Sequence, residues 1–154
     1  MSEPKQLSAI GRILFGLLST ALLAPVAALG DEHAFIRTAD SAELEWGPCP
    51  EFMPEGCAIA VLQGNPAEPN ADVFFRLPAG ATAPLHRHAS AERMVLVSGE
   101  MQVRYEGQEP VVLKTGTYAF GPPRLPHDAT CRSATDCVLF IAFEEPVDAV
   151  AVED

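Results

Sequence analysis

Residues 80–99 read GATAPLHRHASAERMVLVSG and carry the strongest indication of the fold in this sequence. They include His86 and His88, separated by one residue, and Glu92, which follows four positions later. Successive side chains of a β-strand point to opposite faces, so His86 and His88 share one face. The small residues at 89–91 allow a kink that returns the Glu92 carboxylate to that same face.

A second stretch, Gly116 to His127, brings a third histidine. His127 follows a segment with three prolines, at 122, 123 and 126, and opens another expected strand, 127–131. Three imidazoles and one carboxylate suit one borderline divalent ion such as Fe, Mn, Zn, Ni or Cu. The alternative is that they are ordinary polar residues on a barrel rim. Because metal-binding imidazoles must be neutral, we expect metal affinity to fall as the pH drops through about 6.5.

The rest of the sequence indicates an all-β domain. Short apolar runs alternate with Gly, Pro and Asn signals, and 14 prolines among 154 residues argue against a helical bundle. The length fits a single domain. The expected strands are 58–62, 72–77, 85–88, 92–97, 101–105, 111–113, 117–120, 127–131 and 137–143.

The charge balance excludes several partner classes. Lysine and arginine number 10 against 21 aspartates and glutamates, which gives a formal net charge of −11. A nucleic-acid-binding domain presents a basic face, so we expect no nucleic-acid partner. The same charge disfavours docking on an anionic membrane surface.

Residues 1–30 resemble a targeting segment rather than part of the folded domain. Lys5 and Arg12 precede the uncharged run 13–29, which ends in small residues, as in a secretory signal peptide. We therefore expect cleavage near Gly30, a periplasmic or secreted protein, and no stable membrane insertion after cleavage. An uncleaved membrane anchor is the alternative.

Four cysteines lie after the expected cleavage site, and export favours disulfides with three alternative pairings. We favour Cys49–Cys57 and Cys131–Cys137, because each pair brackets a turn. A thiol metal site is the alternative. Cys131 also lies four residues after His127 on the expected strand 127–131, hence on the same face, so it could instead face the metal cavity.

Residues 80–99 resemble the first motif of the cupin superfamily, G-x5-H-x-H-x3-E-x6-G, at every signature position. Residues 116–127 resemble the second motif, G-x5-P-x-G-x2-H-x3-N, except that Arg124 stands where the family has glycine. Cys131 stands where the family has asparagine. The resemblance covers 58–145 as a small single-domain cupin, or monocupin. It implies a jelly-roll β-barrel and is compatible with a homodimer. The implied metal ligands are His86, His88, Glu92 and His127.

Family resemblance fixes no reaction. We expect an exported, metal-dependent oxidoreductase of the dioxygenase type that acts on a small organic molecule, with Glu92 as ligand and proton acceptor. The alternatives are a metal-dependent lyase or isomerase, and a non-catalytic small-molecule-binding or sensory module. The expected organisation is a signal peptide (1–30), an irregular N-terminal arm (31–57), the barrel (58–145) and a C-terminal tail (146–154).

Further side chains are weaker candidates. Met94 and Leu96 lie two and four residues after Glu92 and therefore share its strand face, which places them in the pocket wall or in ordinary core. Tyr118 and Phe120 are candidates for the cavity wall. Three arginines are candidate contacts for an acidic substrate, or else solvated side chains: Arg76, Arg104 and Arg124. His33 is expected to be exposed.

Overall fold

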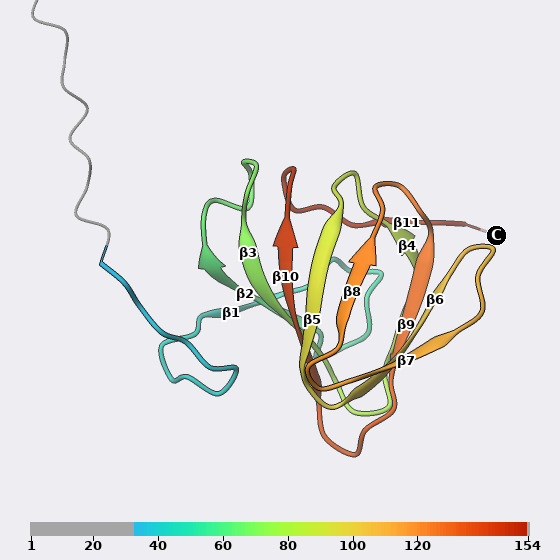
Figure 1. Cartoon of the computed structure of the whole chain (residues 1–154), viewed down its shortest axis with the longest axis horizontal. Coiled ribbons are helices and arrows are strands. Elements are labelled where there is room, and N and C mark those ends of the chain that lie inside the picture. Colours follow the sequence, from blue (N-terminus) through green and yellow to red (C-terminus); the bar gives the residue numbers. More distant parts are fainter. Residues whose placement is uncertain (1–32, 154) are drawn as a thin grey trace, which may run out of the picture. The chain divides into compact units, whose positions relative to one another are not determined.

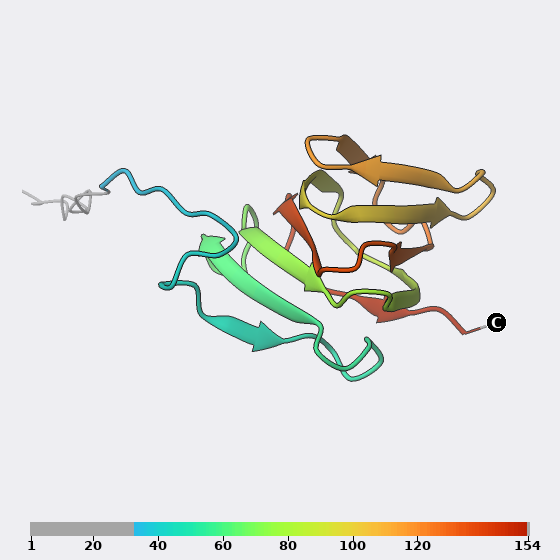
Figure 2. The ribbon, with the colours of Figure 1, turned by 90° about the horizontal axis from the view of Figure 1, so that it is seen from below.

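The computed structural model describes residues 33–153, and all regular structure among them is β-strand. Two antiparallel sheets face each other; their strands are labelled in Figure 1 and seen from a second direction in Figure 2. The first sheet has the order β1 (Trp46–Pro48), β2 (Ala58–Gln63), β3 (Asp72–Leu77), β10 (Cys137–Phe143), β5 (Glu92–Ser98), β8 (Tyr118–Gly121). The second has the order β11 (Val150–Ala151), β4 (Thr82–Arg87), β9 (His127–Cys131), β6 (Glu100–Tyr105), β7 (Val111–Lys114).

The predicted all-β jelly-roll barrel is confirmed. The expected signal peptide, residues 1–30, lies outside the described residues. The described part of the chain contains no helix with the length and hydropathy of a membrane span.

Alternate residues of each strand line the space between the sheets, as expected for strands that are buried on one face. In β9, His127, Ala129 and Cys131 are buried, while the residues between them are partly exposed. In β3, Val73 and Leu77 are almost fully buried in the same core. The inner faces therefore supply a continuous apolar interior that ends in polar side chains.

The strand β4 departs from this alternation at its middle. Ala83 and His86 are both buried, although a regular strand would place residues three apart on opposite faces. The pairing of β4 with β9 shifts register between these two residues, which marks a β-bulge. Pro84, which cannot donate to a strand ladder, lies within the shift. The bulge thus turns His86 inward on the same face as Ala83.

Two short strands differ from the sequence expectation. β1 lies within residues 31–57, expected to be irregular, and β11 lies within the expected tail and pairs with β4. Strands of two or three residues are too short for an alternating pattern to appear in the sequence. β4 also begins at Thr82 rather than at residue 85, because its bulge interrupts the alternation.

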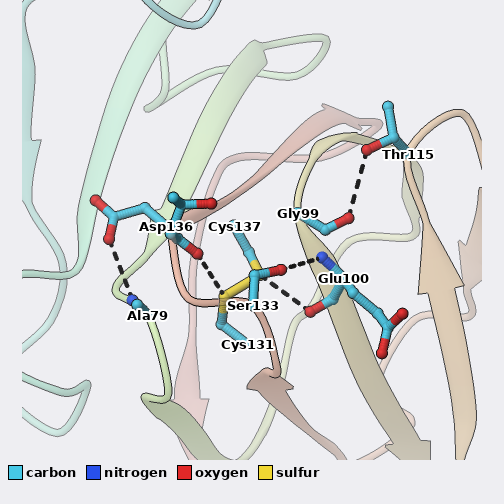
Figure 3. Close-up of a disulfide and its surroundings, with 9 residues drawn as sticks. Ala79, Gly99, Glu100, Thr115, Cys131, Ser133, Asp136 and Cys137 are labelled. Carbon is cyan, nitrogen blue, oxygen red and sulfur yellow. Dashed lines mark hydrogen bonds between the residues drawn. A yellow bond between two sulfur atoms is a disulfide. The ribbon is translucent and has the colours of Figure 1, made fainter.

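Both favoured disulfides are present, Cys49–Cys57 and Cys131–Cys137, with Cα–Cα distances of 5.6 and 5.7 Å. Figure 3 shows the second bridge between the end of β9 and the start of β10, beside Ser133, whose hydroxyl accepts a backbone hydrogen bond from β6. Because Cys131 is bonded to Cys137, its sulfur is not a metal ligand. Two disulfides are typical of proteins from oxidising compartments.

Four signature positions of the motifs adopt a left-handed backbone: Gly80, Gly99, Gly116 and Arg124, with φ angles of 71°, 88°, 87° and 64°. A Cβ atom at Gly99 would lie 2.8 Å from the Cys137 sulfur, so glycine is needed there for space as well. Arg124 stands where the cupin motif has glycine, and it keeps the left-handed backbone despite its side chain. Its N–H donates to the His88 carbonyl at 2.7 Å, which ties the second motif to the first.

Replacement of Arg124 by glycine should stabilise the protein. A side chain in the left-handed region costs roughly 1–2 kcal/mol, and the greater freedom of glycine in the unfolded chain offsets roughly 0.5–1 kcal/mol of this gain. We expect R124G to raise the free energy of unfolding by about 0.5–1 kcal/mol in urea denaturation with the disulfides intact.

The matched control is Lys114→Gly, which replaces an exposed strand residue that does not have a positive φ. This change should lower the free energy of unfolding, because glycine has more conformational freedom to lose on folding and no left-handed strain is relieved at this position. A destabilised R124G would show that Arg124 makes a compensating contact.

Candidate metal centre

The four residues predicted as metal ligands lie together at one end of the barrel. His86 is near the end of β4, His88 follows it, and Glu92 and His127 begin β5 and β9. All four are buried, with exposed fractions between 3% and 8%. Strand ends that are far apart in the sequence therefore deliver four titratable side chains into one apolar interior.

Sheet register explains their proximity. His86 lies directly opposite His127 across the β4–β9 pair, and the two ring centroids are 4.3 Å apart. On the other side of His127, Tyr105 is its direct partner across β6–β9, with ring centroids 5.1 Å apart. His86, His127 and Tyr105 thus form one row across the second sheet.

The kink expected at residues 89–91 is held by Ser90, which is almost fully buried. Its hydroxyl donates to the Ala91 carbonyl and accepts the backbone N–H groups of Glu144 and Glu145, at 2.9 and 3.0 Å. These bonds fasten the β4–β5 connection to the end of β10. The kink brings Glu92 back toward His88, as the sequence predicts.

Each of the three imidazoles is oriented by a backbone carbonyl. The Nδ1 atom of His86 lies 2.7 Å from the Pro84 oxygen, and that of His127 lies 3.2 Å from its carbonyl partner, Leu125. The Nδ1 atom of His88 bonds to the Asp148 carbonyl. Because a carbonyl oxygen can only accept, each Nδ1 must carry the hydrogen, which leaves Nε2 unprotonated in the neutral ring. This is the tautomer that presents Nε2 as a metal ligand.

His86, His88 and His127 could hold a metal ion, since their ligand atoms lie within 4.8 Å of one another. Glu92 adjoins two of them: its Oε1 is 3.4 Å from the Nε2 of His88, and its Oε2 is 3.6 Å from the Nε2 of His127. The donor set of neutral imidazoles beside one carboxyl group fits a borderline divalent ion.

Burial dominates the electrostatics of the cluster. It lowers the pKa of His88 to about 4 and that of His127 to about 3, with the neighbouring His86 contributing to both, and it also lowers the pKa of His86. Burial, together with the charge of Asp148, raises the pKa of Glu92 to about 8. In the metal-free protein near neutral pH, the rings are therefore neutral and Glu92 is mostly protonated.

These shifts change the pH dependence expected from the sequence. His88 and His127 stay neutral well below pH 6.5, and the pKa of His86 is lowered too, so protons on the rings compete less with a metal near pH 6.5 than the sequence suggests. The competing proton is the one on Glu92, whose pKa is about 8. We therefore expect metal affinity to fall as the pH drops below about 8, and not first near 6.5.

A cavity of about 230 Å³ opens onto the cluster. Its walls are mostly apolar side chains from both sheets, including Val73, Met94 and Ile141. Cys49, Pro50 and Met53 from the first disulfide loop and residues 147–149 from the tail complete the lining. The N-terminal arm and the C-terminal tail, for which the sequence predicts no regular structure, thus both contribute to the cavity.

Several weaker candidates do not take part in the site. Tyr118 and Phe120 were expected to wall the cavity, but both are exposed, because β8 presents them on its outer face. Leu96 is fully buried core and does not line the cavity, whereas Met94 does. His33 is exposed, as expected.

The three arginines considered for an acidic substrate lie outside the cavity lining. Arg76 stacks over the Trp46 ring, with its guanidinium carbon 4.3 Å from the ring centroid. Arg104 pairs with Asp128, and Arg124 is exposed.

Sequence reasoning missed two residues of the site, Tyr105 and Asp148. The alternation of Met101, Val103 and Tyr105 along β6 signals that Tyr105 points inward, but its pairing with His127 is a matter of register that no short pattern reveals. Asp148 lies in the unpatterned tail. Its carbonyl orients His88, and its carboxylate accepts the backbone N–H of Ala89 at 2.9 Å.

The model of the ChrR cupin-like domain family matches residues 35–146, which include every strand from β1 to β10. The chain matches no curated protein.

Among solved structures, the chain is similar to the DMSP lyase DddQ from Ruegeria pomeroyi DSS-3, with 22% identity and a TM-score of 0.61, covering 71% of this chain and 61% of that one. It is similar to the polyketide cyclase RemF from Streptomyces resistomycificus, with 16% identity and a TM-score of 0.63, covering 78% of this chain and 87% of that one. The chain is also similar to an oxalate oxidase, with 18% identity and a TM-score of 0.61, covering 89% of this chain and 75% of that one. The chain spans less than two thirds of the length of DddQ. At these identities the similarity shows the fold alone.

Metal binding should release a proton from Glu92. At pH 6 the carboxyl is protonated in the metal-free protein and ionised as a ligand, so we expect about one proton released per Mn²⁺ bound. Isothermal titration calorimetry in two buffers of different ionisation enthalpy measures this number. The control variant Glu92→Gln has no proton to lose at this position and should release none. Equal proton release by both proteins would contradict the assignment.

Proposed function

Because the chain belongs to the ChrR cupin-like domain family, we propose that it is an exported, metal-binding cupin that acts as an oxidoreductase of the dioxygenase type on a small organic molecule. The observation that carries this proposal is the cluster of three inward-facing imidazoles at the polar end of an otherwise apolar cavity.

In this proposal His86, His88, Glu92 and His127 bind one divalent ion, either Fe, Mn, Zn, Ni or Cu. The donor chemistry supports the set, since three Nε2 atoms and a carboxyl oxygen converge there. When bound, such an ion supplies a Lewis acid, or for Fe, Mn and Cu a redox centre, for substrate oxygens.

The chain's own residues supply orientation, exclusion of water and proton transfer. Carbonyl bonds fix the imidazoles, so the site needs little rearrangement to bind an ion. The apolar wall removes the reacting end of a substrate from bulk water. Glu92 is the residue that can accept a proton from the substrate, since its carboxyl group faces the cavity.

A metal-dependent lyase or isomerase is the second candidate, and the state of Glu92 favours it. Its carboxyl group is buried and faces the cavity, where it can accept a proton from a carbon atom of the substrate. Among the similar structures, DddQ is described as a DMSP lyase.

The test is turnover by the protein reconstituted with Fe²⁺ or Mn²⁺. We expect O₂ consumption with at least one member of a panel of small diketones, phenols and acids, measured with an oxygen electrode and product analysis. The double variant H86A/H88A should lose both the metal and the activity while keeping its β-sheet circular dichroism.

The matched control is His33→Ala, which removes an exposed histidine outside the cluster and should keep both properties. Eliminated or isomerised products without O₂ uptake would replace the oxidoreductase by the second candidate. Ligand binding without any product would indicate a binding or sensory module. Full metal retention by H86A/H88A would refute the site itself.

Export is part of the proposal and rests on the charge-poor run 13–29 and on the two disulfides. Expression of the full chain in a Gram-negative host should give a periplasmic protein whose mass corresponds to cleavage after Gly30 or Ala28. Mass spectrometry of the soluble periplasmic fraction measures this. An intact Met1 end on the mature protein would contradict export by a cleaved signal peptide.

A further inference from the structure

We propose that the cavity selects an uncharged, largely apolar ligand with one oxygen-bearing end, and that the Tyr105 hydroxyl donates a hydrogen bond to that end. The inference rests on the proposed function in one respect: the oxygen-bearing end is the part that lies at the metal site.

The lining of the cavity argues against an anionic ligand. Among the described residues that line it, none is a lysine or an arginine, and the acidic side chains are Glu92 and Asp148. A divalent ion beside the ionised Glu92 carries a net charge of +1 and could balance one negative charge of a ligand. The second carboxylate of a dicarboxylate would exchange its hydration for an apolar wall without a cationic side chain to compensate. An uncharged ligand avoids this cost.

The rest of the wall suits an apolar body. It is built mainly from aliphatic and aromatic side chains, among them Ile59, Phe75, Val103, Leu139 and Phe143. The volume of about 230 Å³ lies below the roughly 300–1,000 Å³ of sites for drug-sized ligands. The ligand class is therefore a small molecule with a compact apolar part.

The Tyr105 hydroxyl is the polar feature that this site leaves unused. Among the described residues, it is a buried side-chain oxygen with no hydrogen-bond partner. Leaving a buried hydroxyl unpaired costs roughly 1–3 kcal/mol, which phenylalanine at the same place would avoid. A ligand oxygen that accepts a hydrogen bond from Tyr105 accounts for the hydroxyl.

Gly121 allows the β8 backbone to lie close to that hydroxyl. It lies directly opposite Glu92 across the β5–β8 pair, and its φ is not positive, so its backbone does not require glycine. A Cβ atom there would lie 3.1 Å from both the Tyr105 hydroxyl and the Glu92 Oε2. The missing side chain thus lets β8 pack closely without displacing the Tyr105 hydroxyl or the Glu92 carboxyl group, both of which line the cavity.

Two measurements test the inference, and the first needs no metal. In urea unfolding of the metal-free, ligand-free protein, Tyr105→Phe should raise the midpoint, because it removes an unpaired buried hydroxyl. The control is Tyr118→Phe, which alters the chain's other tyrosine, exposed on β8, and should leave the midpoint unchanged. A lowered midpoint for Y105F would show that the hydroxyl serves the fold and would overturn the inference.

The second measurement uses Co²⁺-loaded protein, whose visible absorption reports ligand binding. We expect maltol, a hydroxyketone that is uncharged in solution and releases its hydroxyl proton to the buffer when it binds the metal, to bind more tightly than the dianion oxalate. Y105F should weaken maltol binding about fivefold to tenfold, the loss of one neutral hydrogen bond, with unchanged cobalt content, while Y118F should bind maltol as the wild type does.

Tighter binding of oxalate, or equal maltol affinity in Y105F and wild type, would overturn the inference. A wild-type protein that retains no cobalt would instead refute the metal site of the proposed function. In that case the unfolding comparison still decides whether the Tyr105 hydroxyl is free to serve a ligand.

Discussion

Burial of three imidazoles in an apolar barrel requires that every ring nitrogen be used, and each Nδ1 meets this requirement by donating to a backbone carbonyl. The three carbonyls come from three irregular features of the chain. Pro84 lies in the β4 bulge, Asp148 in the tail before β11, and Leu125 in the turn that contains Arg124. Each irregularity thus holds one ring with its Nε2 directed inward.

These features also depend on one another. The N–H of Arg124 reaches the His88 carbonyl, so the strained turn that positions His127 is tied to the segment that carries His88. The tail reaches the same segment through Asp148 and continues as β11 along β4. The metal centre therefore lies where distant segments converge. The Cys131–Cys137 bridge joins β9 to β10 at the ends of these strands that lie away from the metal centre.

The sequence was sufficient for the fold class, for both disulfides and for the meeting of the three histidines, because strand parity and motif spacing are local patterns. It was insufficient for β1 and β11, which are too short to alternate. Tyr105 and Asp148 reach the site through register and through tail packing, which no neighbouring residue encodes. The prediction that Tyr118 and Phe120 line the cavity was wrong for a related reason. Alternation along a strand assigns residues to two faces but does not say which face points inward.

The most direct test of this account is the tautomeric state of the histidines, read from long-range ¹H–¹⁵N NMR correlations of metal-free protein. Three of the four histidines should carry hydrogen on Nδ1 and have an unprotonated Nε2. His88 and His127 should stay neutral down to about pH 5, since burial lowers their pKa values to about 4 and 3. Rings protonated on Nε2, or titration of all the histidines near pH 6.5, would contradict the account.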